Sequence, residues 1–133
     1  MGSIVTEDNK CVTDIKRRIA LVKQAFQNKV KLLTDNHISL EIRKHFAKTF
    51  VWSVLTYGCE AWTLGKAEKK RLEAMEMWIW RRMKKTSWVE RKSNDQVLIE
   101  VNENRTLLKY IGRRKAKMIG HIMRHNQFLT NIF

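Results

Sequence analysis

The stretch "LEAMEMWIWRRMKKTSW", residues 72–88, decides the class of fold that this sequence favours. At about 100° per residue, one narrow helical face contains the apolar side chains of Leu72, Met75, Ile79 and Met83. The opposite face gathers cations, namely Lys70, Arg81, Lys84 and Lys85. This spacing predicts an amphipathic helix from about Lys66 to about Lys85 that packs its apolar stripe into a core.

The tryptophans of this stretch differ in helical phase. Trp78 and Trp80 fall at the two borders of the apolar stripe, where an indole can bury its ring and keep its N–H near water or a partner. Aromatic side chains at helical spacing usually pack, and packing is the favoured role for Trp78 and for Trp52. Stacking on a base or sugar is the alternative for Trp80 and for Trp88, which lies beyond the helix end.

Further amphipathic segments precede this helix. From Asp14, an apolar face follows helical spacing through Ile15, Ile19, Val22, Phe26, Val30 and Leu33. The pattern breaks at Thr34–His37, and Ser39 is the expected N-cap of a second helix. That helix becomes apolar nearly all round from Val51 to Tyr57, so we expect it at the buried centre of the bundle.

The two ends of the chain complete the fold prediction. A short helix is expected at Asp95–Val101, and Asn104 is the expected cap of a last helix. The stripe of that last helix consists of Leu108, Ile111, Met118, Ile119 and Ile122. Ser3–Thr6 looks like a short strand, whereas the absence of proline and the five glycines favour helix elsewhere. The prediction is an all-α bundle of three longer helices, a short helix and a final helix, with a short N-terminal strand remnant.

Composition limits the partners. The 133 residues suit one ordinary domain, and 27 Lys and Arg against 13 Asp and Glu give a formal charge of +14. Such an excess usually serves a polyanion, either nucleic acid or an anionic membrane. The longest strongly apolar stretch, Phe50–Leu64, is too short and too polar to span a bilayer, and no signal peptide opens the chain. Two cysteines, Cys11 and Cys59, fit a reducing compartment, so we expect an intracellular protein without membrane contact.

Catalytic and metal-binding patterns are weak in this sequence. The aspartates are scattered singly, and no glycine loop that could hold a phosphate is present, so no catalytic residue and no cofactor is predicted for the chain itself. His121 and His125 stand one helical turn apart, as in half of a zinc site, but no second half accompanies them. Histidines near a helix end and its dipole are the more common interpretation.

The basic clusters are the strongest functional signal. Each predicted helix carries cations away from its apolar stripe, so a packed bundle would expose a widely basic surface. A solvated charged face is the alternative, but the balancing carboxylates are few. We predict contacts to the nucleic-acid backbone from Arg17, Arg18, Lys70, Arg81, Lys84 and Lys85, with stacking by Trp88. A second predicted patch consists of Arg113, Arg114 and Lys117.

Five stretches together carry a family pattern: "GSIVTEDNKCVTDIKRRIALVKQAF", "SLEIRKHFAKTFVWSVLTYGCEAWTL", "KAEKKRLEAMEMWIWRRM", "RTLL" and "GHIMRH". In this order they resemble the region just after the polymerase palm in the endonuclease-reverse transcriptases of animal non-LTR (LINE-type) retrotransposons. The resemblance covers nearly the whole chain. Its specificity lies in combining Tyr-Gly-Cys-Glu-x-Trp, Glu-Met-Trp-x-Trp-Arg-Arg-Met and Gly-His-x-x-Arg-His, since each piece alone is weak. Ile79, where many relatives have cysteine, and "VERKSNDQ" depart from the pattern.

The resemblance implies a division of the chain into three parts. Residues 1–13 would be a remnant of the palm exit, with Gly2–Val5 near the primer grip. Residues 14–88 would form the helical thumb that holds the primer–template duplex, and residues 89–133 would begin the linker beyond it. The family's endonuclease domain, and its palm with an Asp-Asp pair that binds Mg²⁺, are missing from this sequence. We therefore expect a fragment of an RNA-directed DNA polymerase that has no catalytic activity of its own.

The function expected from this resemblance is sequence-nonspecific binding of RNA and DNA in the nucleus, through the backbone of a primer–template duplex. A competing hypothesis is a domesticated helical interaction module. In that case the apolar faces would recruit a protein that replaces the lost palm.

Overall fold

The computed structural model describes the backbone of residues 2–86 and 88–132 and the side chains of residues 11–86 and 89–125. Its elements are α1 (Gly2–Asn28), α2 (Val30–Leu33), α3 (Leu40–Phe46), the π-helix η1 (Ala47–Val51), α4 (Trp52–Thr56), the 3₁₀ turn η2 (Cys59–Ala61), α5 (Lys66–Met83), the 3₁₀ turn η3 (Trp88–Glu90), α6 (Asn94–Val101) and α7 (Leu107–Ile132). The described residues contain no strand, so the prediction of an all-α fold is confirmed.

The predicted strand at Ser3–Thr6 is wrong, because this segment lies inside α1. A strand needs a neighbour to pair its backbone groups, and the described chain offers none, whereas a helix pairs them locally. The first helix therefore begins well before Asp14.

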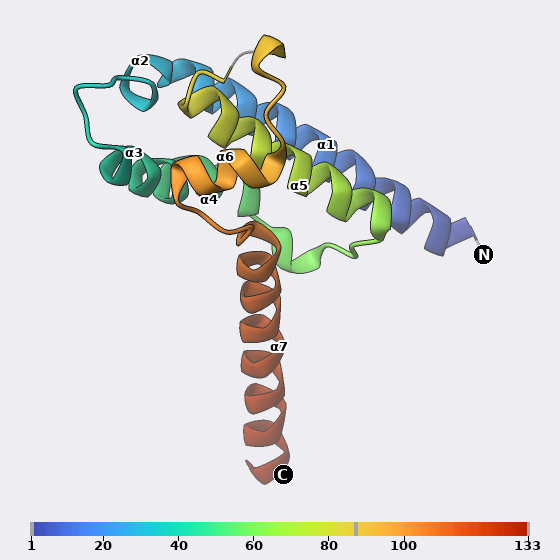
Figure 1. The fold of residues 1–133 in the computed structure, drawn as a ribbon. Coiled ribbons are helices and arrows are strands. Elements are labelled where there is room, and N and C mark those ends of the chain that lie inside the picture. The colour runs from blue at the N-terminus through green and yellow to red at the C-terminus, as the bar shows by residue number, and fades with distance from the viewer. Residues whose placement is uncertain (1, 87, 133) are drawn as a thin grey trace.

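The long helices α1 and α5 lie side by side, and α4 also packs on α1 (Figure 1). α6 crosses α5, and only the first part of α7 reaches the bundle, at α5 and η2. The rest of α7 extends away from the other helices as a separate rod (Figure 1). None of the helices within the described residues is long and apolar enough to cross a bilayer.

The core follows the predicted stripes. The stripe of α5, formed by Leu72, Met75, Ile79 and Met83, is buried. On α1, α2 and the turn between them, the fully buried side chains are Ile15, Val22, Phe26 and Leu33. Ile19 and Val30 are partly buried against the same cluster. Periodicity alone therefore identified the buried faces of α1 and α5.

The second predicted helix is divided. Ser39 caps α3 as expected, since its Oγ accepts a hydrogen bond from the Ile42 backbone N–H at 3.3 Å. The chain then widens into the π-helix η1 before α4, which changes the face presented to the core. Val51, Trp52 and Leu55 are buried as predicted. Tyr57 is 71% exposed, because α4 ends at Thr56 and the backbone turns away there.

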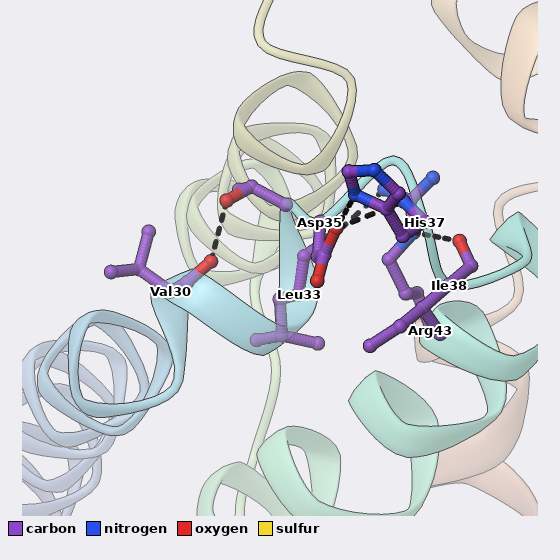
Figure 2. Close-up of polar contacts among 7 residues, drawn as sticks. Val30, Leu33, Asp35, His37, Ile38 and Arg43 are labelled. Carbon is purple, nitrogen blue, oxygen red and sulfur yellow. Dashed lines mark hydrogen bonds and ion pairs between the residues drawn. The ribbon is translucent and has the colours of Figure 1, made fainter.

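A buried arginine joins two helix ends. The Arg43 guanidinium donates to the backbone carbonyls of Leu33 at 3.2 Å, Ile38 at 3.1 Å and Met83 at 3.3 Å. Figure 2 shows Arg43 of α3 beside Leu33, which ends α2, and Ile38, which lies in the turn between the two helices. Carbonyls at helix C-termini lack partners within their own helix and carry partial negative charge. Arg43 therefore holds the last turns of α2 and α5 together.

A buried carboxylate fixes the start of α7. Glu76 on α5 is 1% exposed, and its Oε1 accepts a hydrogen bond from the Thr106 backbone N–H at 3.1 Å. Burial raises the pKa of Glu76, and hydrogen bonds from the Thr106 and Leu107 backbone oppose that rise. The predicted cap at Asn104 is wrong, because α7 begins at Leu107 and a side chain distant in sequence satisfies its first N–H groups.

Candidate nucleic-acid interface

A basic cavity of about 920 Å³ lies at the C-terminal end of α5, and we call it the α5 groove. Its lining consists of Val30, Thr34, Trp78, Arg81, Arg82, Lys85, Thr86, Arg91 and Lys92. These residues come from α2, from the last turns of α5 and from the connection between α5 and α6. The helix packing described above therefore brings five cations to one concave surface.

The connection that forms one wall of the groove has an unusual backbone. Lys85 and Arg91 both adopt left-handed conformations, with φ of 54° and 50°. For residues other than glycine this conformation is unfavourable by roughly 1–2 kcal/mol each. Arg81 holds the connection in place, because its Nη2 donates to the Lys92 carbonyl at 2.8 Å and to Asn94 Oδ1 at 2.8 Å. Arg81 thus fixes the part of the connection that follows Arg91.

Trp78 forms the aromatic part of the groove and packs as predicted. Its ring meets Phe26 edge-on at a centroid distance of 5.2 Å and is partly buried against the core. The Arg82 guanidinium carbon lies 4.9 Å from the ring centroid, and Lys23 Nζ lies 5.4 Å from it. These cation–π contacts hold Arg82 and Lys23 against the Trp78 ring.

Trp80 is not a border residue, so the suggestion that it stacks on a base is wrong. Its side chain is fully buried, 6.4 Å from the Trp52 ring between centroids. The reason is that α5 is covered by α1 on one side and by α6 and α7 on another, which makes its buried arc wider than one stripe. The side chain of Trp88, the other stacking candidate, lies outside the described residues.

The cations of the α5 groove differ in their partners. Lys92 pairs with Glu100 at 2.7 Å and with Glu90 at 3.6 Å, and the hydrogen bond to Glu100 raises the pKa of Lys92. Among the described side chains, no carboxylate pairs with Arg82, Lys85 or Arg91, all of which are exposed. These three residues are therefore the cations available to an external anion.

The other residues predicted on the first patch are dispersed. Arg17 is exposed on α1, and Lys84 is exposed at the C-cap of α5. Lys70 is exposed on the same helix, about 16 Å before Arg81 at 1.5 Å per residue. Arg18 is partly buried. Its Nη1 donates to the Val54 carbonyl at 3.4 Å, and its guanidinium carbon lies 4.9 Å from the centroid of the Tyr57 ring. Arg81 and Lys85 are the predicted residues that the structure brings together in one groove.

The second predicted patch forms another concave surface, the α7 groove, of about 960 Å³. Its lining consists of Glu60, Tyr110, Arg113, Arg114, Lys117, Met118, His121 and Arg124. Arg114 pairs with Glu60 at 2.8 Å and donates to Thr56 Oγ1 at 3.0 Å, so it serves as a tie between α7 and the bundle. Arg113, Lys117 and Arg124 are exposed and have no carboxylate partner among the described side chains.

Sequence reasoning missed three residues of the α5 groove: Arg82, Arg91 and Lys92. Arg91 and Lys92 belong to "VERKSN", which reads as a plain polar connector. One signal for them was available in the sequence, because the connector is rich in cations and follows a helix end that is also rich in cations. A connector must fold back near the helix it leaves, so its cations can join those of the helix end.

No metal site accompanies the two histidines of α7. The described residues contain no group of three or more His, Cys, Asp or Glu side chains that could hold an ion, so His121 and His125 lack further ligands there.

Comparison with known proteins gives one informative similarity. The chain is 28% identical over 127 residues to a putative uncharacterized transposon-derived protein of Caenorhabditis elegans, F52C9.6. The match covers 93% of this chain and 45% of the worm protein, so the chain spans less than half of that relative's length. No protein-family model matches the chain, and no solved structure matches it. The similarity points to a transposon-related protein.

Proposed function

We propose that this chain is the thumb and post-thumb linker region of a retrotransposon reverse transcriptase, and that it binds the backbone of a primer–template duplex. The α5 groove is the observation that carries this proposal, because it gathers exposed, unneutralised cations on one concave surface. The family resemblance of the sequence supports the same assignment, and the transposon-derived relative supports a transposon origin.

The chemistry of the α5 groove favours phosphate as the ligand. Arg82 and Arg91 carry planar guanidinium groups, which bind phosphate oxygens through paired N–H donors, and Lys85 adds a flexible point charge. The formal charge of +14 would attract a polyanion over longer range. Backbone contacts of this kind carry no sequence information. RNA and DNA duplexes are therefore both expected ligands, bound without sequence preference.

Catalysis belongs to the palm of the parent family in this proposal. In the parent family the palm's Asp-Asp pair would hold Mg²⁺, and this chain would only hold the duplex near it. The purified chain should consequently incorporate no nucleotides in a primer-extension assay with Mg²⁺. Incorporation above background would contradict the assignment of a noncatalytic region.

Salt dependence of duplex binding provides the direct test. If about six phosphates are neutralised, log K should fall with log salt with a slope of about −5. The triple variant R82Q/K85Q/R91Q should reduce the magnitude of this slope by about 2–3. It should also weaken the binding of every duplex tested, whatever the nucleotide sequence. Fluorescence anisotropy with RNA–DNA and DNA–DNA duplexes measures both quantities.

A matched control is needed, because removing any three cations lowers the net charge equally. K16Q/K66Q/K109Q changes three exposed lysines outside the α5 groove. The control should lower affinity much less than the groove variant. An equal loss in both variants, or no duplex binding by the wild type at low salt, would refute the proposed site.

A further inference from the structure

An exposed aromatic ring stands at the end of the α7 groove nearest the bundle. Tyr110 lines this groove, and its side chain is 38% exposed. The buried Trp52 ring packs against it, with a centroid distance of 5.9 Å and an angle of 51° between the rings. In the α5 groove, by contrast, the Trp78 ring already holds Arg82 and Lys23. Tyr110 is therefore a ring that the core supports and whose uncovered part is available to a ligand.

Three free cations continue from Tyr110 along one side of α7. Counting about 100° per residue, Arg113, Lys117 and Arg124 fall within about 40° of one another and within about 60° of Tyr110. At 1.5 Å per residue, this row from Tyr110 to Arg124 is about 21 Å long. The three cations are exposed, and α7 extends beyond the bundle along much of this length (Figure 1). The row is therefore open to a long, thin anionic ligand.

The exposed apolar side chains of α7 lie mainly on another face. Met118 borders the α7 groove, but by the same count Ile119 and Ile122 lie on the side of the helix opposite the cations. A ligand that follows the cations does not need to contact these isoleucines. An anionic membrane would have to take up the apolar face, and that orientation would turn the cations away from the lipid headgroups.

A single strand of nucleic acid fits this arrangement. Bases in a duplex are stacked on one another, so an unpaired strand can place a base on an aromatic side chain far more readily. Proteins that bind single strands combine such a ring with a positively charged groove that follows the phosphates. A stacked strand rises about 3.4 Å per nucleotide, so the length from Tyr110 to Arg124 corresponds to about six nucleotides.

We infer that the α7 groove binds single-stranded nucleic acid, with a base on Tyr110 and the phosphates along Arg113, Lys117 and Arg124. The site lies on a different helix from the α5 groove. It goes beyond the proposed duplex site and does not depend on it. DNA and RNA strands share the phosphates and base faces that this groove recognises, and separate probes distinguish them.

Binding of short oligonucleotides to the full chain tests the inference. The probes are fluorescein-labelled oligothymidylates and oligouridylates of roughly 3 to 12 nucleotides, measured by anisotropy at low salt. Affinity should rise steeply up to about six nucleotides and only slowly beyond, because longer strands pass the end of the row. Binding should persist in R82Q/K85Q/R91Q, where the α5 groove has lost its free cations. No binding of either probe in this variant would overturn the inference.

A charge-matched pair of variants locates the strand on α7. R113Q/K117Q should weaken oligothymidylate binding by about tenfold at low salt and reduce the salt slope by about 1.4, at about 0.7 for each phosphate contact of a single strand. The control K16Q/R71Q also removes one arginine and one lysine, both exposed and outside the two grooves. It should weaken binding by less than about twofold. Equal losses in the two variants would contradict a site at α7.

The role of Tyr110 separates a single strand from a duplex. Y110L should weaken oligothymidylate binding by about fivefold, whereas Y110F, which keeps the ring, should bind like the wild type. Y57L changes an exposed tyrosine outside the groove and should have no effect. A blunt hairpin duplex should bind equally to Y110L and the wild type. Circular dichroism checks that Y110L is folded, and R113Q/K117Q, at two exposed positions, decides the question if it is not.

The remaining outcomes separate this inference from its competitors. It fails if folded Y110L binds oligothymidylate like the wild type, or if it weakens the duplex as much as the single strand. It also fails if phosphatidylserine vesicles bind through Ile119 and Ile122 while neither oligonucleotide binds. Duplex binding that R82Q/K85Q/R91Q abolishes would persist in each of these cases, so the α7 site and the proposed duplex site can fail separately.

Discussion

The α5 groove and the α7 groove are nearly equal in size, about 920 and 960 Å³, and both are strongly basic, but their surroundings differ. In the α5 groove the free cations stand beside an indole that is already packed and held by Arg82 and Lys23. In the α7 groove one arginine is neutralised by Glu60, and the neighbouring surface is an exposed apolar stripe. Positive charge by itself therefore does not define a ligand; the groups beside the charge do.

The largest expected difference between the two regions is in stability. W80A removes a fully buried indole of α5 and should lower the free energy of unfolding by about 3–5 kcal/mol. M118A shortens an exposed side chain on α7 and should change the free energy of unfolding by less than about 0.5 kcal/mol. Urea denaturation measures both values. Similar losses in the two variants would mean that the Met118 side chain is buried in solution.

The next effect concerns Arg43, which binds the Met83 carbonyl at the end of α5 that carries the α5 groove. R43Q cannot reach all three carbonyls that the guanidinium binds, and unpaired buried carbonyls should lower the free energy of unfolding by about 2–3 kcal/mol. Because the Met83 carbonyl ends α5, duplex binding at the α5 groove should weaken as well. A duplex affinity that R43Q leaves unchanged would contradict this role of Arg43.

The smallest effect is expected from Glu76, which attaches α7 to α5. Because burial raises the pKa of Glu76, the folded state holds its proton more tightly than the unfolded state does. Stability should therefore fall as the pH rises from the ordinary carboxyl pKa through the raised one, and this loss is complete above both values. E76Q removes the titration but leaves an oxygen that can accept from Thr106 N–H.

Thermal unfolding at several pH values tests this expectation. The melting temperature of the wild type relative to E76Q should decrease as the pH rises across that window, and E73Q, on a partly exposed carboxylate of the same helix, provides a matched control. A difference that is independent of pH would show that Glu76 does not titrate with folding.

The parts of the fold that follow from local pattern were predictable. The apolar stripes of α1 and α5 and the cap at Ser39 depend on spacing and on one side chain near its own helix. Trp80 could not be placed in the core, because its burial depends on α6 and α7 crossing α5. The cap of α7 was missed for the same reason, since Glu76 lies far from Thr106 in sequence.

The candidate site was predictable in kind and only partly in membership. An excess of cations indicated phosphate contact, but Arg18 and Arg114 are bound to neighbouring helices, and Arg82 and Arg91 joined the groove without being expected. Buried Arg43 and Lys44 carried no signal that separates them from surface cations. Which cation faces outward is decided by long-range packing, and composition does not contain that information.

The attachment of α7 also has a mechanical consequence. At 1.5 Å per residue the helix is about 39 Å long, but it is held mainly by its first turns, at Glu76, Glu60 and the Trp62 carbonyl. It therefore acts as a lever arm with its pivot at the bundle. A tilt of about 10° at the pivot would move the far end by about 7 Å, which is more than one helical turn. Small rearrangements where α5 meets α7 would thus become large displacements of anything bound near the tip.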